Sequence, residues 1–473
     1  MKTGNWALIA LSAALLSGCA TRGSLVMKCD GFKDFITELK PSRLVQDIQS
    51  DVAVSIDLMR NPATMDLAPR FDSGPDPLAA SLRALTDGNT QAAAMTGRGD
   101  GPPPRAALLL SGGGQWGAFG AGFLSKVQTD PRTHIDFGVI TGVSTGGLQS
   151  LFLAIDDEGA YRRLRIAYAP ENEKQVVKRN PKALTVVTGS LAGLAPLRKR
   201  IEAALCTGGD AAKGCPMIDK LAASGRNVFI GFVEAKSGNF YYADAKAIAE
   251  SAQGGGPQRM NAQQCLTGVA LASAAMPVFF QQVKIGDHAY YDGGVRQSVF
   301  EENISGALDA AVQSARADAR RRSGNPAASQ AIAMPALYVV RNGPTQLLGD
   351  KGKPEDDVGP DSKADALTAA FRAEAIVVNQ LEVGSIAALR LSHPTGAINL
   401  VTADGYHRWL TPPDAGAFKG CDKPKDMMFD PTFMGCLQRL GEWKAARRAP
   451  QSPWISLSPL AIDTAAEATR DGH

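Results

Sequence analysis

One short segment, Gly142-Val143-Ser144-Thr145-Gly146, constrains the fold more than any other, because it matches the pattern G-x-S-x-G. An apolar stretch at 137–141 predicts a strand before it, and the residues at 145–155 predict a helix after it. A serine at such a sharp strand-to-helix turn needs glycines two positions away on each side, and its oxygen then lies at a helix N-terminus. The segment predicts a nucleophile elbow with Ser144 as the nucleophile; an ordinary glycine-rich turn is the alternative.

A second glycine-rich segment, Ser111–Gly117, precedes the elbow by about 30 residues. Consecutive glycines at Gly112, Gly113 and Gly114 allow several backbone N–H groups to point into one concavity, as an oxyanion hole or a phosphate nest requires. No Gly-Lys-Ser/Thr follows, which excludes a P-loop, and no acidic residue fits the dinucleotide-binding pattern. One strand–helix–strand unit brings these glycines near Ser144, so we predict an oxyanion hole.

A histidine triad is the first alternative for activating the serine. In the order of the α/β-hydrolases, Ser144 and Asp292 would be completed by His393 or His407. Those enzymes, however, take an oxyanion donor from a loop two strands before the elbow strand. Here only about 25 residues separate the glycines from the elbow, which is room for one helix and one strand. The spacing therefore argues against the triad, although a serine peptidase of this kind stays an alternative.

Composition excludes several classes of protein. The 50 basic and 47 acidic residues leave a net charge of +3, too balanced for a protein that binds nucleic acid by neutralising phosphates. With 44% hydrophobic and 21% charged residues, the chain is an ordinary globular one rather than a disordered or multi-span membrane protein. We expect helices over residues 28–85, a Gly/Pro-rich linker over 86–104, and alternating strands and helices after that.

The N-terminal residues predict an export signal. Lys2 is followed by the apolar stretch 6–16, which is about half the length that a membrane span needs, and then by Ser17, Gly18 and Cys19. This arrangement resembles the bacterial lipobox, in which the cysteine is lipidated and becomes the first mature residue. Ala20, where an aspartate would favour inner-membrane retention, points to an outer-membrane lipoprotein facing the periplasm. A plain secretory signal is the alternative.

Six cysteines remain after Cys19, and an oxidising compartment would permit disulfides. Local pairs, Cys206 with Cys215 and Cys421 with Cys436, would leave Cys29 for Cys265. Six cysteines nevertheless allow 15 connectivities, and buried free thiols are a further alternative. No Cys/His spacing indicates zinc, and we expect neither a metal nor an organic cofactor.

Three motifs in order resemble those of the patatin-like phospholipases: the loop Gly112–Gly117, the elbow Gly142–Gly146, and Asp292-Gly293-Gly294. A fourth, Ala272–Pro277 with Phe280 after it, is similar to the segment that precedes the aspartate of that family. The resemblance covers roughly residues 105–300, with 336–400 completing the sheet. It implies a three-layer α/β/α fold with a glycine-rich oxyanion loop and a nucleophile elbow. One departure is Trp116, where the family often has Arg or Lys, so a cation that pairs with phosphate is missing from the loop.

The resemblance also implies a catalytic dyad in which Ser144 is the nucleophile and Asp292 the base. Desolvation in a dry cleft would make the carboxylate a stronger base; a simple turn residue is the other interpretation of Asp292. Backbone N–H groups of Gly113 and Gly114 would stabilise the oxyanion, with Gly112 shaping the loop, and losing one donor typically costs about 3–4 kcal/mol. The remaining motif glycines would support the backbone: Gly117, Gly142, Gly146, Gly293 and Gly294.

These observations predict four segments: a lipoprotein signal peptide (1–18), a helical extension with its linker (19–104), a catalytic domain (105–400) and a C-terminal elaboration (401–473). The expected function is hydrolysis of lipid acyl esters through an acyl-enzyme, with a lipid or phospholipid substrate and membrane attachment through Cys19. Two alternatives are acyl transfer to an acceptor other than water, and a non-catalytic envelope lipoprotein that binds lipid or a partner protein.

Overall fold

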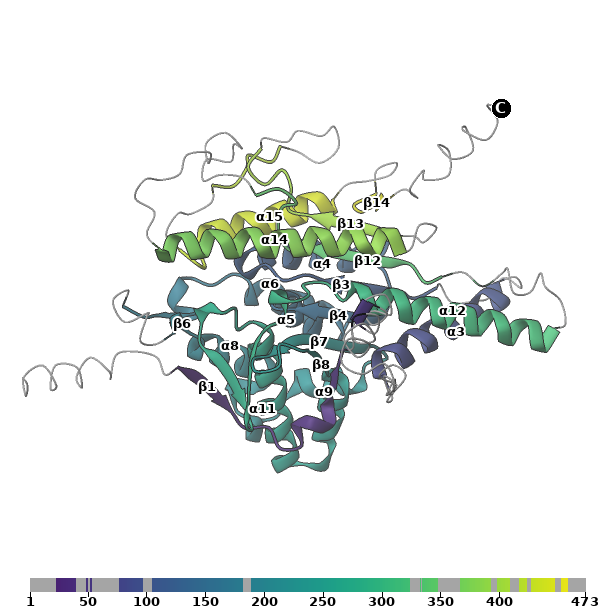
Figure 1. Cartoon of the computed structure of the whole chain (residues 1–473), viewed down its shortest axis with the longest axis horizontal. Coiled ribbons are helices and arrows are strands. Elements are labelled where there is room, and N and C mark those ends of the chain that lie inside the picture. The colour runs from purple at the N-terminus through teal and green to yellow at the C-terminus, as the bar shows by residue number, and fades with distance from the viewer. Residues whose placement is uncertain are drawn as a thin grey trace, which may run out of the picture.

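The computed structural model describes residues 23–39, 48–49, 52, 76–96, 104–181, 189–323, 332, 334–347, 366–392, 398–408, 417–422, 427–446 and 452–457. These residues form one large mixed sheet with helices on both faces and a second, small sheet beside it (Figure 1).

The centre of the large sheet is parallel, in the order β7-β4-β3-β12-β13. Its strands are β3 (Ala106–Leu110), β4 (Phe137–Val143), β7 (Asn227–Glu234), β12 (Leu337–Arg341) and β13 (Ile398–Thr402). Every residue of β3 and β4 is buried. Continuous apolar strands of this kind are typical of a parallel sheet that is covered on both faces. The strand predicted over 137–141 is confirmed as β4.

Antiparallel strands extend the sheet on both sides. They are β8 (Phe240–Asp244), β10 (Gln282–Ile285), β11 (His288–Asp292) and β14 (Ile455–Leu457). Strand β11 pairs with β7, β10 pairs with β11, and β14 pairs with β13. Strands β7 and β8 form a hairpin, whose turn holds Gly238 at a φ of 71°. The small sheet contains β5 (Lys178–Arg179), β6 (Ser190–Gly193) and β9 (Val278–Phe280).

Helices cover the two faces of the large sheet (Figure 1). Leu108 and Leu110 of β3 point into a core shared with α4 (Gly117–Thr129), α5 (Thr145–Leu153), α6 (Glu158–Ala167), α8 (Ala195–Leu205), α9 (Pro216–Ala223), α10 (Ala245–Glu250), α11 (Gly256–Ser273) and α15 (Pro431–Ala445). Ala107 and Leu109 point into the opposite core, with α3 (Pro77–Thr96), α12 (Glu301–Ser323) and α14 (Ala366–Ser392). This alternation builds the three-layer α/β/α fold that the sequence predicts.

The expected helix over residues 28–85 is wrong at its beginning. The structure has strand β1 (Ser24–Met27), a short 3-10 helix (Phe32–Phe35) and strand β2 (Ile36–Glu38) there. Strand β2 pairs with β8, and Phe32 packs against Phe232. The apolar residues that suggested a helix instead pack at the edge of the large sheet. Their tertiary contacts override the local preference for a helix. Most of residues 40–75 lie outside the described residues.

The expected linker over 86–104 is also corrected, because α3 continues through Gly88 to Thr96. Leu78, Leu82 and Leu85 of this helix are buried against the sheet. Their burial outweighs the cost of a glycine inside a helix, which is about 1 kcal/mol. Residues 97–103, the rest of the expected linker, lie outside the described residues.

The three predicted disulfides are confirmed. Cys206 bonds to Cys215 and Cys421 to Cys436, each closing a local loop. The bond between Cys29 and Cys265 joins residues 236 positions apart and ties the N-terminal segment to α11.

Among the helices that the structure describes, none is long and apolar enough to span a bilayer.

Removing the long-range disulfide should destabilise the protein more than removing a local one. A cross-link that closes a longer loop restricts the unfolded chain more. The double change Cys29→Ser with Cys265→Ser should lower the free energy of unfolding by about 4–5 kcal/mol, against about 2–3 kcal/mol for Cys206→Ser with Cys215→Ser. Guanidinium unfolding of both variants and the parent measures this difference. Equal losses would contradict the loop-length explanation.

Candidate active site

Ser144 sits in a strained turn between β4 and α5. Its φ and ψ angles are 55° and −123°, a region that residues other than glycine rarely adopt. The flanking glycines allow the backbones to approach one another. A Cβ on Gly142 would lie 2.4 Å from the Gly146 carbonyl oxygen, and one on Gly146 would lie 2.4 Å from the Leu110 carbonyl oxygen. The local geometry is that of the predicted nucleophile elbow.

A serine of α11 holds the elbow in place. The Ser144 N–H donates a hydrogen bond of 2.7 Å to Ser273 Oγ, and the Ser273 hydroxyl donates one of 2.6 Å to the Gly231 carbonyl of β7. Ser273 is fully buried. The segment Ala272–Pro277 was recognised from the sequence, but the hydrogen bonds of Ser273 depend on where α11 packs.

The glycine loop faces Ser144 directly. A Cβ on Gly112 would lie 3.4 Å from the Cβ of Ser144. Gly113 and Gly114 have positive φ angles of 138° and 55°, and a Cβ on Gly113 would lie only 1.9 Å from the Asn342 carbonyl oxygen. The loop then enters α4 at Gly117, where a Cβ would lie 2.0 Å from Thr145 Oγ1. Glycine is therefore required along this loop by close packing as well as by backbone conformation.

The N–H groups of the loop are not equivalent. Gly112 donates its N–H to Ser298 Oγ at 3.1 Å. Among the described residues, neither Gly113 nor Gly114 donates its N–H to a protein acceptor. The N–H groups of Gly113 and Gly114 thus fit the predicted oxyanion donors, while Gly112 faces Ser144 and is held by Ser298. Their part in catalysis stays a prediction.

Asp292 ends β11 at the level of the elbow. It is almost completely buried, with 1% of its surface exposed, and its Oδ1 accepts the Gly294 N–H at 2.8 Å. Asp292 is in register with Phe232 of β7, and Val143 of β4 is in register with the adjacent Gly231. The turn after Asp292 crosses the intervening strand, because a Cβ on Gly293 would lie 2.9 Å from Val143 Cγ1.

Ser298 connects the aspartate turn to the glycine loop. A Cβ on Gly294 would lie 3.8 Å from Ser298 Oγ, the atom to which Gly112 donates. The structure therefore gathers Ser144, Gly112 and the Asp292 turn around one buried hydroxyl. No motif in the sequence identifies Ser298, which follows the Asp292-Gly293-Gly294 segment by four residues.

A buried ion pair supports that hydroxyl. Ser298 donates a hydrogen bond of 2.7 Å to Glu382 Oε1 of α14, and Glu382 Oε2 lies 3.0 Å from Arg341 Nη2 at the end of β12. Both charged residues are at most 3% exposed. Burial raises the pKa of Glu382, and the positive charge of Arg341 limits that rise. No motif in the sequence points to Glu382 as part of the site. The one signal for it is an acidic residue within an apolar stretch of the helix α14.

Further contacts hold the outer side of the glycine loop. Asn342 donates its backbone N–H to Ser111 Oγ and exchanges side-chain hydrogen bonds with Gln149. Trp116, the residue that departs from the expected Arg or Lys, packs edge-on against Tyr406 and Phe433, with ring centroids 4.8 and 5.0 Å away. At this position an aromatic contact with the C-terminal region replaces the charge of the family pattern.

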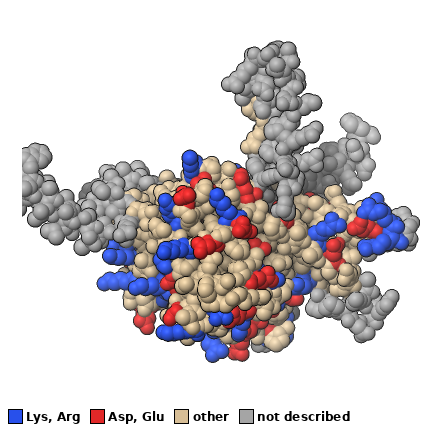
Figure 2. Space-filling view, turned by 90° about the horizontal axis from the view of Figure 1, so that it is seen from below, with Lys and Arg blue, Asp and Glu red and all other residues tan. Residues whose placement is uncertain are grey.

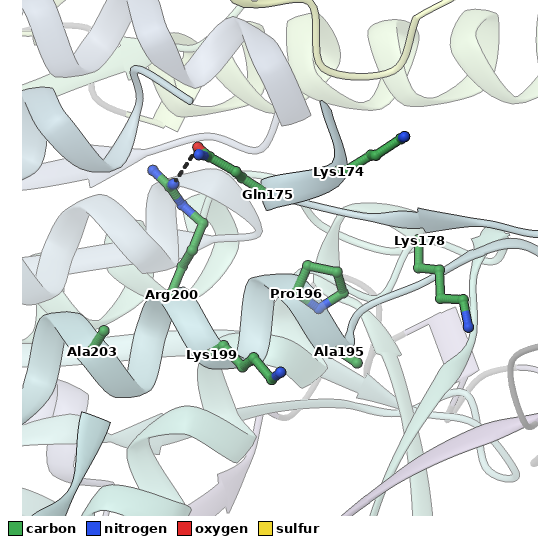
Figure 3. A pocket seen from close by; sticks show the side chains of 8 residues that line it. All are labelled: Lys174, Gln175, Lys178, Ala195, Pro196, Lys199, Arg200 and Ala203. Carbon is green, nitrogen blue, oxygen red and sulfur yellow. Dashed lines mark hydrogen bonds between the residues drawn. The ribbon is translucent and has the colours of Figure 1, made fainter. Parts of the chain in front are cut away.

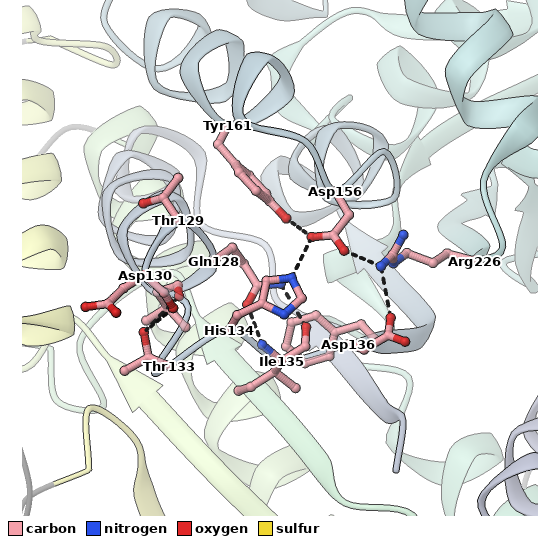
Figure 4. Close-up of polar contacts among 12 residues, drawn as sticks. Gln128, Thr129, Asp130, Thr133, His134, Ile135, Asp136, Asp156, Tyr161 and Arg226 are labelled. Carbon is pink, nitrogen blue, oxygen red and sulfur yellow. Dashed lines mark hydrogen bonds and ion pairs between the residues drawn. The ribbon is translucent and has the colours of Figure 1, made fainter. Parts of the chain in front are cut away.

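The histidines that the structure describes do not assemble a triad with Ser144. His134 pairs with Asp156 at 3.1 Å in a polar cluster that also holds Asp136, Tyr161 and Arg226 (Figure 4). Asp136 precedes β4, so this cluster lies at the sheet edge opposite Ser144.

Two more histidines have partners of other kinds. His288 lies 3.5 Å from Glu234, and His407 lies beside Arg408. His393 and His473 lie outside the described residues. Within the described part of the chain, no group of three or more His, Cys, Asp or Glu side chains has the arrangement of a metal site.

A family model matches the part of the chain that contains most of this site. The model of a family described as patatin-like phospholipase matches residues 108–302, a range that contains the glycine loop, the elbow and Asp292. The match supports lipid acyl hydrolase activity in general. No curated protein matches the chain. Arg341 and Glu382 lie beyond the matched range, so this chain adds them to the site from its C-terminal part.

Ser298→Ala should reduce turnover of an ester substrate by about tenfold to a hundredfold while changing KM little. Without the hydroxyl, the Gly112 N–H loses its acceptor and the loop shifts, whereas oxyanion donors must lie within about 2.7–3.1 Å of the developing charge. Steady-state kinetics of purified variants measures both constants.

Ser305→Ala is the matched control for this change. Ser305 is also a buried serine, but its hydroxyl has no hydrogen-bond partner in the described structure. Its kcat should stay at the parent value. A Ser298→Ala enzyme with the same kcat as Ser305→Ala would show that the hydroxyl does not position the loop.

Proposed function

We propose that this chain hydrolyses acyl esters of lipids through an acyl-enzyme on Ser144, with Asp292 as the base. The match of residues 108–302 to the model of the patatin-like phospholipase family supports this proposal. The observation that carries the proposal is the strained Ser144 turn, which faces the glycine loop and lies level with the buried Asp292. Strain of this kind persists only where the surrounding structure enforces it, and it is concentrated at functional sites.

In the proposed reaction, the Asp292 carboxylate accepts the proton of the Ser144 hydroxyl as Oγ attacks the ester carbonyl carbon. The N–H groups of Gly113 and Gly114 stabilise the resulting oxyanion. When the tetrahedral intermediate collapses, the ester C–O bond breaks and the departing alcohol takes the proton from Asp292. Water then attacks the acyl-enzyme and gives its proton to the same carboxylate. Collapse of the second intermediate releases the fatty acid and returns the proton to Ser144.

The alternative acyl acceptors use the same site, because only the second nucleophile differs. A hydroxyl-bearing acceptor in place of water would give a new ester rather than a free acid. A non-catalytic protein that only binds lipid would not need a buried carboxylate level with a strained serine. The described geometry therefore favours catalysis over binding alone.

We also propose that the protein is an envelope lipoprotein, with residues 1–18 removed, Cys19 lipidated, and the folded part facing the periplasm from the outer membrane. The three disulfides support an oxidising compartment, since such bonds form and persist there. Mass spectrometry of the mature N-terminus tests the lipidation. An unmodified Cys19 would reject it.

Ser144→Ala and Asp292→Asn should each reduce fatty-acid release by at least about a thousandfold without unfolding the protein. The substrates are mixed phospholipids and neutral esters, and released fatty acid is measured beside circular dichroism. Asp287→Asn, the same change at an exposed turn residue, should leave activity unchanged. A folded, active Asp292→Asn protein would overturn the dyad.

Adding alcohols or lysolipids to the same assay separates hydrolysis from transfer. Free fatty acid as the main product supports the hydrolase. New esters that depend on Ser144 would assign the protein to acyl transfer instead. No product from either reaction, with a folded parent protein, would reject a catalytic role.

A further inference from the structure

A basic pocket lies on the surface beside the small sheet (Figure 3). Its volume is about 520 Å³, and it lies between the short 3-10 helix Glu173–Gln175, strand β5 and the beginning of α8. Its cationic lining residues are Lys174, Lys178, Lys199 and Arg200. Pro196 stands in the first turn of α8, so the N-terminal end of this helix also borders the pocket.

The three lysines are available for an external anion. Lys174, Lys178 and Lys199 are exposed, and none forms an ion pair with a described residue. Arg200 differs, since it donates to the carbonyls of Ile166 and Ala167 and to Gln175. Arg200 therefore has a structural role in the wall of the pocket, and the three lysines provide the charge that can bind an anion. Figure 2 shows lysine and arginine side chains projecting at the same edge of the molecule at which the small sheet lies in Figure 1.

The nearby acidic residues do not cancel this charge. Glu173 is bound by Arg179 through two hydrogen bonds, and Glu171 accepts a hydrogen bond from Gln175. Burial lowers the pKa of Arg200, and the carboxylate of Glu171 opposes that shift. The pocket therefore keeps a net positive charge.

The described chain begins beside the same small sheet. Ser24 of β1 is in register with Gln282, two residues after Phe280, and Phe280 pairs with Ala192 of β6. Cys19, the proposed lipid anchor, precedes Ser24 by five residues. Five residues span at most about 17 Å even when fully extended. If Cys19 carries acyl chains, the surface around β1 and the small sheet, here called the flank, must stay close to the bilayer.

An exposed apolar side chain adds to this flank. Val278 of β9 is 42% exposed and has a φ of 70°, a conformation in which a β-branched residue is strained. It follows Ser273, which holds Ser144, by only five residues. The flank is therefore connected to the site of the proposed chemistry by a short stretch of chain.

We propose that the pocket of Lys174, Lys178 and Lys199, together with Val278 at the opposite edge of the same small sheet, is the surface by which this protein docks on an anionic phospholipid bilayer. The lysines bind lipid phosphate groups, and Val278 enters the interface between headgroups and acyl chains. Docking there brings the lipid surface to the side of the fold on which α11 leads to Ser144. This docking surface would bring the enzyme to its lipid substrate, so the proposal rests on the lipid hydrolase function proposed above.

Vesicle binding tests the surface independently of catalysis. The protein is the chain from residue 19 with Cys19→Ser, which retains every described residue but carries no acyl chain, and with Ser144→Ala, which prevents hydrolysis. Cosedimentation with phosphatidylcholine vesicles in which a third of the lipid is phosphatidylglycerol should show binding that weakens with added salt. Vesicles of phosphatidylcholine alone should bind much more weakly.

The triple change Lys174→Ala, Lys178→Ala and Lys199→Ala should weaken this binding by roughly a hundredfold, since each basic side chain near an anionic surface contributes about fivefold. The matched control removes three charges at the end of α12, through Arg320→Ala, Arg321→Ala and Arg322→Ala; this helix lies on the opposite side of the molecule (Figure 1). The control should bind as the parent does. Equal losses in both variants, or none in the lysine variant, would overturn the proposal.

Val278→Gly separates docking from folding. Glycine relieves the strained φ, so thermal stability should stay the same or rise, while vesicle binding should fall by roughly threefold to tenfold. Unchanged vesicle binding would show that Val278 is not part of the docking surface.

Activity distinguishes failure of this inference from failure of the proposed function. With Ser144 restored, the lysine variant should hydrolyse a soluble short-chain ester at the parent rate but vesicle phospholipid more slowly. No ester hydrolysis by the parent would reject the proposed function, whereas equal vesicle rates for parent and variant would reject the docking surface.

Discussion

The close approach of backbones around Ser144 is the constraint on which the rest of the site depends. The end of β3, the elbow after β4 and the start of α5 come so near one another that Gly142 and Gly146 have no room for a Cβ. Ser273 then fixes the elbow to β7 through two short hydrogen bonds. Because the Ser144 backbone is strained, these contacts have to outweigh the cost of that conformation, which is of the order of 1–3 kcal/mol. A rigid three-layer core makes this possible.

Polar groups far apart in the sequence hold the glycine loop against that elbow. Ser298, Glu382 and Arg341 form one side of the support, and Asn342 with Gln149 forms the other. An ion pair buried this deeply is stable only when its charges remain matched, because an uncompensated charge in the interior is costly. Part of the loop's support thus comes from β12 and α14, beyond the region that matches the family. Trp116 of the loop is also supported from beyond that region, because its ring packs on Tyr406 and Phe433.

The features recognisable from sequence were those produced by local chemistry. Glycines at fixed offsets from Ser144 and consecutive glycines at 112–114 predicted tight turns, and the structure has them. Buried apolar runs predicted the central strands. Local reasoning failed for residues 28–39, where apolar side chains at helical spacing belong to a sheet edge, and for α3, whose Gly88 resembled a linker. In both places burial against distant elements outweighed local preference.

The sequence by itself thus determined the α/β alternation, the elbow and the glycine loop, because each depends on backbone conformations that only certain residues adopt. It also suggested the cysteine pairs that the fold contains. Only the tertiary structure decided that Gly112 gives its N–H to Ser298, that Glu382 reaches the site from α14, and that three lysines surround one pocket. These contacts join residues from different elements. Their formation depends on how the layers pack, and no local pattern encodes that.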